Sequence, residues 1–98
     1  MSDKLKIKRG SANVFRELGF PAEEAQNLLL RSELMTRIER HVKASGLNQK
    51  EAAAQLGVTQ PRLNDLLKGK IEKFSLDALV NMLGRAGMRV ELSVRKAA

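Results

Sequence analysis

The fold of this chain is decided by residues 48–70, which read NQKEAAAQLGVTQPRLNDLLKGK. A helix is expected to begin after Asn48, because its side chain can accept a hydrogen bond from the backbone amide of Glu51 while the Glu51 carboxylate reaches back to the amide of Asn48. This reciprocal arrangement is a capping box. The three alanines that follow permit close approach of another helix and cost little helix propensity. Gly57 can end the helix, so the pattern predicts a short helix over residues 49–56.

A second short helix is expected directly after the turn. Thr59 is a favourable N-cap, and Val58 and Leu63 have the spacing of a hydrophobic staple across that cap. Helical periodicity places Leu63, Leu66 and Leu67 on the inner side. Two short helices joined by a Gly-Val turn, with small residues inside the first and leucines inside the second, have the sequence form of a DNA-binding helix-turn-helix.

A long helical pattern precedes this pair. We predict a helix from Pro21 to about Ser45, because proline suits a first helical position and Gly46 is placed to close the last turn. A break near Ser32 is left open by the pattern. The inner face of this helix is expected to carry Leu28, Leu34, Met35, Ile38 and Val42.

A fourth helix is expected after the pair, with Ser75 as its N-cap. Gly84 and Gly87 bracket the place where it should stop. Its packed face is expected to consist of Leu76, Leu79, Val80 and Leu83.

The same stretch carries a resemblance to a known family. Residues 49–70 resemble the phage-repressor-like family (Cro and lambda-repressor, or XRE) in their small residues at the helix crossing, their turn glycine and their inward leucines. The resemblance extends over about residues 13–95 to an XRE subfamily rich in HigBA-type toxin-antitoxin antitoxins, through the stretches Asn13-Val14-Phe15, Gln60-Pro61-Arg62-Leu63 and Phe74-Ser75-Leu76-Asp77. It implies a mainly α, four- to five-helix lambda-repressor-like DNA-binding domain. It also implies a repressor that binds its own operator and sequesters a partner toxin.

The predicted recognition helix defines the candidate DNA contacts. With its leucines buried and about 100° between successive residues, its opposite side carries Pro61, Asn64, Asp65 and Lys68. Gln60 and Asn64 can pair bidentately with adenine, and Arg62 can pair with guanine or a phosphate. The resemblance to the phage repressors implies that Gln49 reaches a phosphate and braces Gln60. The predicted DNA-contacting residues are Gln49, Thr59, Gln60, Pro61, Arg62, Asn64, Lys68, Lys70 and Lys73.

The charged residues near this helix allow two interpretations each. Asp65 is expected to form a salt bridge with a neighbour such as Lys68, and the alternative is that it accepts from a cytosine amino group. Lys68, Lys70 and Lys73 are expected to contact the DNA backbone, because they follow the helix-turn-helix directly. The alternative for these lysines is an ordinary solvated loop.

The last part of the chain changes to the two-residue period of a strand. Polar residues alternate there with four apolar side chains that we expect at a dimer interface: Met88, Val90, Leu92 and Val94. A lone strand has no ladder partner, so we expect it to pair with the same strand of a second copy, with residues 4–8 as the other candidate. A single intramolecular hairpin is the alternative. In a homodimer, two recognition helices would read a palindromic operator with half-site centres roughly 34 Å apart.

Composition sets the remaining expectations. The chain has 98 residues, 18 basic against 11 acidic side chains and no cysteine, which favours one small domain with a polyanionic partner such as double-stranded DNA. We divide it into a basic arm that allows a short strand and helix (1–20), a helix-turn-helix domain (21–87) and a C-terminal strand and tail (88–98). Residues 1–21 carry five Lys or Arg and two acidic residues, which is a poor electrostatic match for a basic ribonuclease toxin. That arm could instead lie along DNA.

No enzymatic activity, cofactor or metal site is expected. His41 is the only histidine, so the chain lacks the ligands of a zinc site, and we expect His41 to be a partly packed surface residue. The sequence contains no phosphate-cradling glycine motif. Its longest aliphatic run is Leu28-Leu29-Leu30, which is too short for a membrane span. Because the start also lacks an apolar secretory signal, we expect a cytoplasmic protein.

Overall fold

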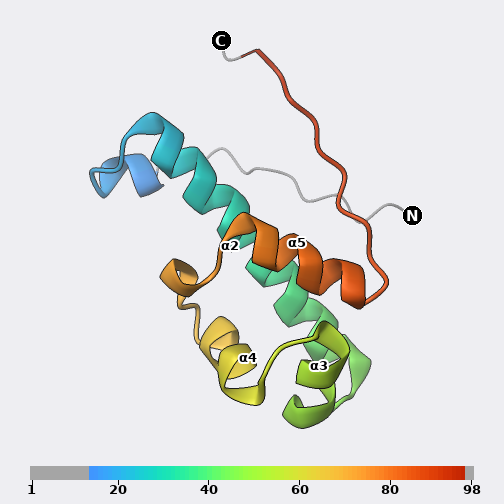
Figure 1. Cartoon of the computed structure of the whole chain (residues 1–98). Helices are drawn as coiled ribbons and strands as arrows, with labels where there is room; N and C mark the ends of the chain where they lie inside the picture. The colour runs from blue at the N-terminus through green and yellow to red at the C-terminus, as the bar shows by residue number, and fades with distance from the viewer. Residues whose placement is uncertain (1–13, 97–98) are drawn as a thin grey trace.

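The long helix α2 (Ala22–Ser45) is the element on which most of the other helices pack (Figure 1). The computed structural model describes residues 14–96 of the chain. After α2 follow α3 (Gln49–Leu56), α4 (Gln60–Leu67), the 3-10 helix η1 (Ile71–Lys73) and α5 (Leu76–Arg85). Residues 14–17 form a further helical stretch before α2. The expectation of a mainly helical domain is thereby confirmed.

The ends of the helices follow local signals in the sequence. Asn48 Oδ1 accepts from the Glu51 amide at 2.8 Å, and the Asn48 amide donates to Glu51 Oε1 at 3.2 Å, so the predicted capping box is present. Thr59 Oγ1 caps α4, and Ser75 Oγ caps α5. Gly46 closes α2 in the left-handed conformation, with a φ of 73°. The helix α2 also runs through Ser32 without the break that the sequence allowed.

The core lies where α2, α3, α4 and α5 meet. α5 packs along α2, α3 packs against α4, and α2 also contacts α4 and η1. Ile38, Leu63 and Leu79 have no exposed surface, and the Phe74 ring between η1 and α5 is 1% exposed. The helices therefore share one apolar cluster, in which α4 is held from two sides.

The prediction that Val80 packs in the core is wrong. Val80 is 40% exposed, and Met82 is buried in α5 instead. The reason is helical geometry, since Leu79, Met82 and Leu83 lie on one stripe and Val80 is turned about 100° away from Leu79.

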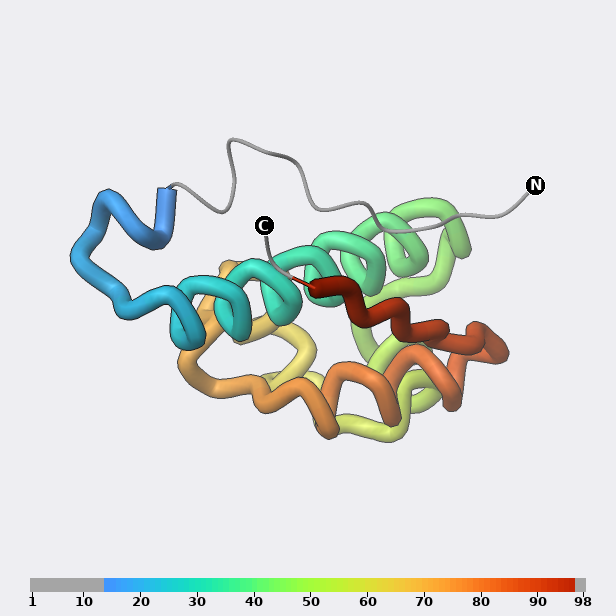
Figure 2. Tube along the Cα trace, turned by 90° about the horizontal axis from the view of Figure 1, so that it is seen from above, coloured from blue at the N-terminus to red at the C-terminus, as the bar shows by residue number. Residues whose placement is uncertain are grey.

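The predicted C-terminal β-strand is absent, and residues 14–96 contain no other strand. Residues 88–96 have no regular secondary structure. They turn back after α5 and lead away from the helices, on the side remote from α4 (Figures 1 and 2). The physical reason is that alternation alone does not make a strand, which also needs a hydrogen-bonded neighbour. One candidate neighbour, residues 4–8, lies outside the described residues.

Among residues 14–96, no helix combines the length and the apolar character that a membrane crossing demands.

Candidate nucleic-acid interface

The turn between α3 and α4 sets the angle of the two helices. Gly57 has a φ of 74°, in the left-handed region, and the following amide of Val58 donates to the Ala53 carbonyl at 3.0 Å. A Cβ on Gly57 would collide with the side chain of Arg85 from α5. On the inner side, Ala52 and Ala53 are 1% and 2% exposed. Glycine in the turn and alanine at the crossing therefore let α4, α3 and α5 approach closely.

The side of α4 opposite its buried leucines is open to solvent. Pro61 and Lys68 are exposed there, Asn64 is half-buried, and Gln60 is exposed next to them at the N-terminal end of α4. We call these four residues the α4 stripe. Helical geometry places Pro61, Asn64 and Lys68 opposite Leu63 and Leu66, which face the core, and Gln60 extends the stripe at the start of the helix. The stripe provides two amide side chains and one cation on a free helix surface.

Gln49 and Thr59 flank the stripe at the N-terminal ends of α3 and α4. Both residues are exposed. Thr59 Oγ1 accepts from the Arg62 amide at 3.3 Å, which leaves its hydroxyl hydrogen free to donate. In the described part of the chain no hydrogen bond joins Gln49 to Gln60, so the expected bracing of Gln60 is not present there.

Arg62 lies on the flank of α4 that faces the segment after it. Its guanidinium carbon is 4.4 Å from the centre of the Phe74 ring, a cation–π contact. Phe74 is buried, and Arg62 is half-buried over it. The structure therefore places Arg62 beside the α4 stripe rather than on it.

Asp65 is held by two lysines from the segment after α4. Lys70 Nζ lies 3.3 Å from Asp65 Oδ1, and Lys73 Nζ lies 3.4 Å from Oδ2. The expected salt bridge is confirmed, but its partners are Lys70 and Lys73 rather than Lys68. Gly69, with a φ of 77°, turns the chain back so that these lysines reach α4.

The two lysines change the pKa of the Asp65 carboxyl. Partial burial raises its pKa, but the hydrogen bonds and positive charges of Lys70 and Lys73 lower it more. The pKa of Asp65 therefore lies below its ordinary value. Two cations flank this one carboxylate and Lys68 is exposed three residues further along the chain, so the surface keeps a positive excess.

Arg31 of α2 anchors the segment between α4 and α5, and this contact was not predicted. Its Nη1 donates to the carbonyls of Ile71 and Phe74 at 3.2 and 3.4 Å, and its Nε donates to Asn27 Oδ1 at 2.7 Å. A sequence signal existed, because Arg31 lies three residues after Leu28 and four before Met35, on the apolar face of α2. A cation on a buried face calls for backbone or acidic partners.

His41 links α2 to α3. Its Nε2 lies 2.9 Å from Gln55 Oε1, and the residue is half-buried. The expectation that His41 is a partly packed surface residue is thereby confirmed. It braces the scaffold of the helix pair and does not belong to the α4 stripe.

Comparison with known proteins agrees with this geometry. A search of curated proteins gave no match. A family model described as a helix-turn-helix domain matches residues 14–95, a range that includes every helix from α2 to α5. The chain therefore belongs to the helix-turn-helix domain family.

Proposed function

We propose that the protein is a sequence-specific, DNA-binding transcriptional regulator that inserts the α4 stripe into a major groove. The observation that carries the proposal is the exposure of Gln60, Pro61 and Lys68 on a helix held by α3, in a chain of the helix-turn-helix family. Such a helix fits a major groove, where base edges carry a distinct pattern of donors and acceptors.

The residues divide into base readers and phosphate contacts. Gln60 and Asn64 have amide groups that suit adenine. Around them, Gln49, Thr59, Lys68, Lys70 and Lys73 are the proposed backbone contacts. Arg62 keeps donors free while its face covers Phe74, so in this proposal it reaches a guanine or a phosphate at the edge of the groove. Pro61 packs against the groove wall.

The operator in this proposal is an inverted repeat in the protein's own promoter. Two copies related by a two-fold axis would present two α4 helices to half-sites roughly 34 Å apart. The proposed dimer surface lies in the C-terminal segment, which carries Met88, Val90, Leu92 and Val94. Binding to the inverted repeat in its own promoter would make the protein an autorepressor.

The experiment is a selection of duplexes from a random pool, followed by fluorescence anisotropy on the selected site and on the protein's own promoter. Affinity should fall steeply with salt, because phosphate contacts release counterions. Asn64→Ala should weaken binding about tenfold and relax the preference at one position of each half-site. Lys68→Ala should weaken all sequences alike and flatten the salt dependence.

The matched control is Lys43→Ala, which removes a cation from the exposed side of α2 and should change affinity little. The proposal fails if no duplex is enriched, if binding ignores salt, or if Lys43→Ala weakens it as much as Lys68→Ala.

The resemblance to HigBA-type antitoxins supports a second, finer proposal, in which the protein also binds a toxin. One structural observation favours protein binding: Val14, Leu18 and Phe20 are 51%, 68% and 37% exposed near the start of the described chain. A cluster of exposed apolar side chains suits a protein partner better than DNA. The alternatives are a stand-alone phage-type repressor and a protein-interaction module on the same scaffold. No catalytic step is proposed for this chain.

Co-expression with the neighbouring reading frame tests this finer proposal. If that frame encodes a toxin, its product should arrest growth when expressed alone, and co-expression with this protein should relieve the arrest and give a complex that co-purifies. Leu18→Asp should abolish both the relief and the co-purification. A neighbour that neither arrests growth nor binds would favour the stand-alone repressor. A partner that binds in the absence of any DNA binding would favour the interaction module.

A further inference from the structure

The C-terminal segment, residues 88–96, leaves much apolar surface uncovered. Its first two apolar side chains, Met88 and Val90, are half-buried and pack against the helical core. The next two, Leu92 and Val94, are 81% and 88% exposed. The start of the segment therefore packs against the core of its own chain, whereas Leu92 and Val94 remain uncovered.

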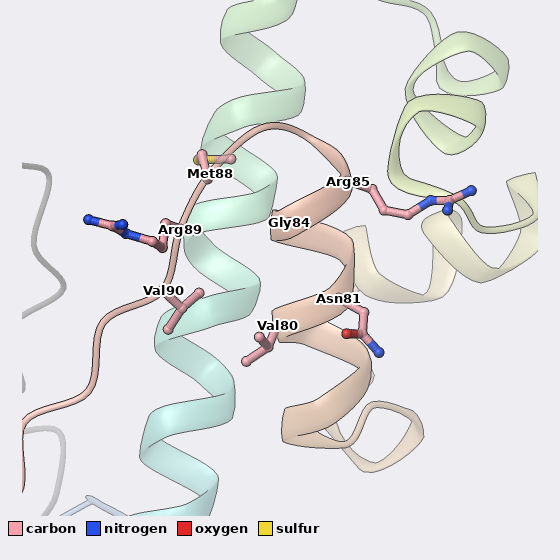
Figure 3. Close-up of a pocket in the computed structure, with 7 residues that line it drawn as sticks. All are labelled: Val80, Asn81, Gly84, Arg85, Met88, Arg89 and Val90. Carbon is pink, nitrogen blue, oxygen red and sulfur yellow. The ribbon is translucent and has the colours of Figure 1, made fainter.

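A groove beside the segment leads from it onto α5. It has a volume of about 650 Å³, and its lining mixes apolar residues, among them Val80 and Val90, with the polar side chains of Asn81, Arg85 and Arg89 (Figure 3). Val80 of α5 lies beside Val90 in this groove and is 40% exposed. A two-stranded ribbon is marginal alone, so its apolar face needs support of this kind from a helix.

We propose that residues 90–96 pair antiparallel with the same residues of a second copy, around a two-fold axis at Ser93. Leu92 then lies opposite the partner's Val94, and Glu91 lies opposite the partner's Arg95. By symmetry each pair forms twice. The proposal rests on the proposed function and deepens it, because it assigns Leu92 and Val94 to the dimer and Met88 and Val90 mainly to the monomer core.

Charge selects this register. Glu91 is 68% exposed and has an arginine, Arg89, at 3.1 Å within its own segment. Arg95 is exposed and has no ion-pair partner within residues 14–96. An axis at Ser93 gives Arg95 an acidic partner and brings a second cation to Glu91. Directly opposite charges of unlike sign stabilise an antiparallel pair.

The neighbouring registers are less favourable. Apolar side chains stay opposite one another only when the axis passes through a residue, because directly opposite residues share a face. An axis at Leu92 sets Arg89 opposite the partner's Arg95, and an axis at Glu91 sets two glutamates together. Both place like charges directly opposite each other.

An axis at Val90 pairs Arg89 with the partner's Glu91 but makes a shorter ladder. The chain turns at Gly87, whose φ is 85°, and the Met88 amide already donates to the Leu83 carbonyl at 3.0 Å. The ladder would end there and leave Val94 uncovered. The axis at Ser93 covers both exposed side chains with unlike charges opposed.

The test is sedimentation equilibrium of the full-length protein without DNA. Arg95→Glu should raise the dissociation constant of the dimer about tenfold, because two acidic pairs replace two ion pairs. Glu91→Arg should weaken it similarly, and the double variant should return to within about threefold of the wild type. Arg40→Glu makes the same charge change on the exposed side of α2 and should have no effect.

Other outcomes overturn the inference in recognisable ways. Tighter association of Arg95→Glu would indicate the axis at Leu92, where the new glutamate meets Arg89. No change would indicate an axis at Glu91 or Val90. A wild-type protein that stays monomeric at all concentrations would remove the pairing altogether.

Failure of the pairing can be told apart from failure of the proposed function. Leu92→Lys should give a folded monomer by circular dichroism that still prefers the same half-site, with weaker binding. A folded wild-type monomer with half-site preference would refute the pairing and leave DNA reading in place. A dimer that responds to Arg95→Glu as expected but binds no DNA would refute the function and leave the pairing in place.

Discussion

Asp65 shows how one carboxylate organises the charge beside the α4 stripe. It holds the ammonium groups of Lys70 and Lys73 at 3.3 and 3.4 Å. The carboxylate therefore partly offsets the positive charge of these lysines before any phosphate approaches, whereas Lys68 has no acidic partner within residues 14–96. Asp65 thus limits the attraction of this surface for DNA of any sequence.

Asp65→Asn should strengthen DNA binding while slightly lowering stability. Without the carboxylate, Lys70 and Lys73 are free for phosphates, so affinity should rise for all sequences and the salt dependence should steepen by up to about one further counterion per new contact. Anisotropy titrations at several salt concentrations measure this. An unchanged salt dependence would show that neither lysine reaches the DNA.

The same variant should change the pH dependence of stability. Because the folded-state pKa of Asp65 is lowered, its contribution is present above the unfolded-state pKa and is lost as the pH falls through the folded-state pKa. Urea unfolding should therefore show a smaller loss of stability on acidification for Asp65→Asn than for the wild type. An identical acid profile would mean that the two lysines do not stabilise the folded carboxylate.

Gly57 carries two constraints at once, and a double-mutant cycle separates them. Gly57→Ala should destabilise the protein by at least about 1–2 kcal/mol, because alanine is strained in the left-handed conformation and its Cβ would meet the Arg85 side chain. In an Arg85→Ala background the steric part should disappear, and the cost should be smaller. Thermal or urea unfolding measures both. Equal costs in the two backgrounds would show that Arg85 moves aside freely.

At the scale of elements, the segment between α4 and α5 is clamped from both sides. Arg31 of α2 donates to the carbonyls of Ile71 and Phe74, while Asp65 of α4 holds Lys70 and Lys73. The 3-10 helix η1 therefore connects α2 to α4 as well as linking α4 to α5. Its position sets where the lysines stand relative to the α4 stripe.

Arg31→Met should loosen this segment. The variant keeps the apolar stem but removes the guanidinium donor from both carbonyls, of which that of Ile71 keeps the Phe74 amide, so stability should fall by about 1–3 kcal/mol. Hydrogen exchange should speed up at the Lys73 and Phe74 amides, whose hydrogen bonds close η1. Arg40→Met, at an exposed arginine of the same helix, is the control and should change neither quantity. Unchanged hydrogen-exchange rates in Arg31→Met would show that η1 is stable without the Arg31 hydrogen bonds.

The elements that the sequence predicted well are those with local signals. The capping box at Asn48, the N-caps at Thr59 and Ser75 and the closing glycine at 46 depend on residues three or four positions apart, and all four are present. The apolar stripes likewise predicted the inner faces of α2 and α4. Local periodicity thus accounts for the helices and for the open side of α4.

The contacts that the sequence did not predict depend on which segments the tertiary fold brings together. The stacking of Arg62 on Phe74 and the anchoring by Arg31 join residues that are far apart in sequence or on opposite sides of a turn. Asp65 was expected to pair one helical turn away, with Lys68, but Gly69 brings Lys70 and Lys73 closer. The C-terminal strand does not form within the single chain, because alternation predicts a face and not a hydrogen-bonded neighbour.

At the scale of the whole molecule, stability rests on one small core. Leu79 has no exposed surface, whereas Leu92 is 81% exposed. Leu79→Ala should therefore lower the free energy of unfolding by about 2–5 kcal/mol, a large share of what a small domain has. Leu92→Ala, the same chemical change, should leave the unfolding of dilute protein nearly unaltered. Similar losses in the two variants would show that the C-terminal segment is folded onto its own chain.

The contact between Arg62 and Phe74 also affects the conformational entropy that the arginine side chain loses on binding. A long arginine side chain ordinarily loses much rotational freedom when it is immobilised at an interface. Here the guanidinium already rests 4.4 Å above a buried ring. Rotational freedom of this side chain is therefore already lost during folding. Less is lost when the arginine binds a polyanion, because its side chain is preorganised.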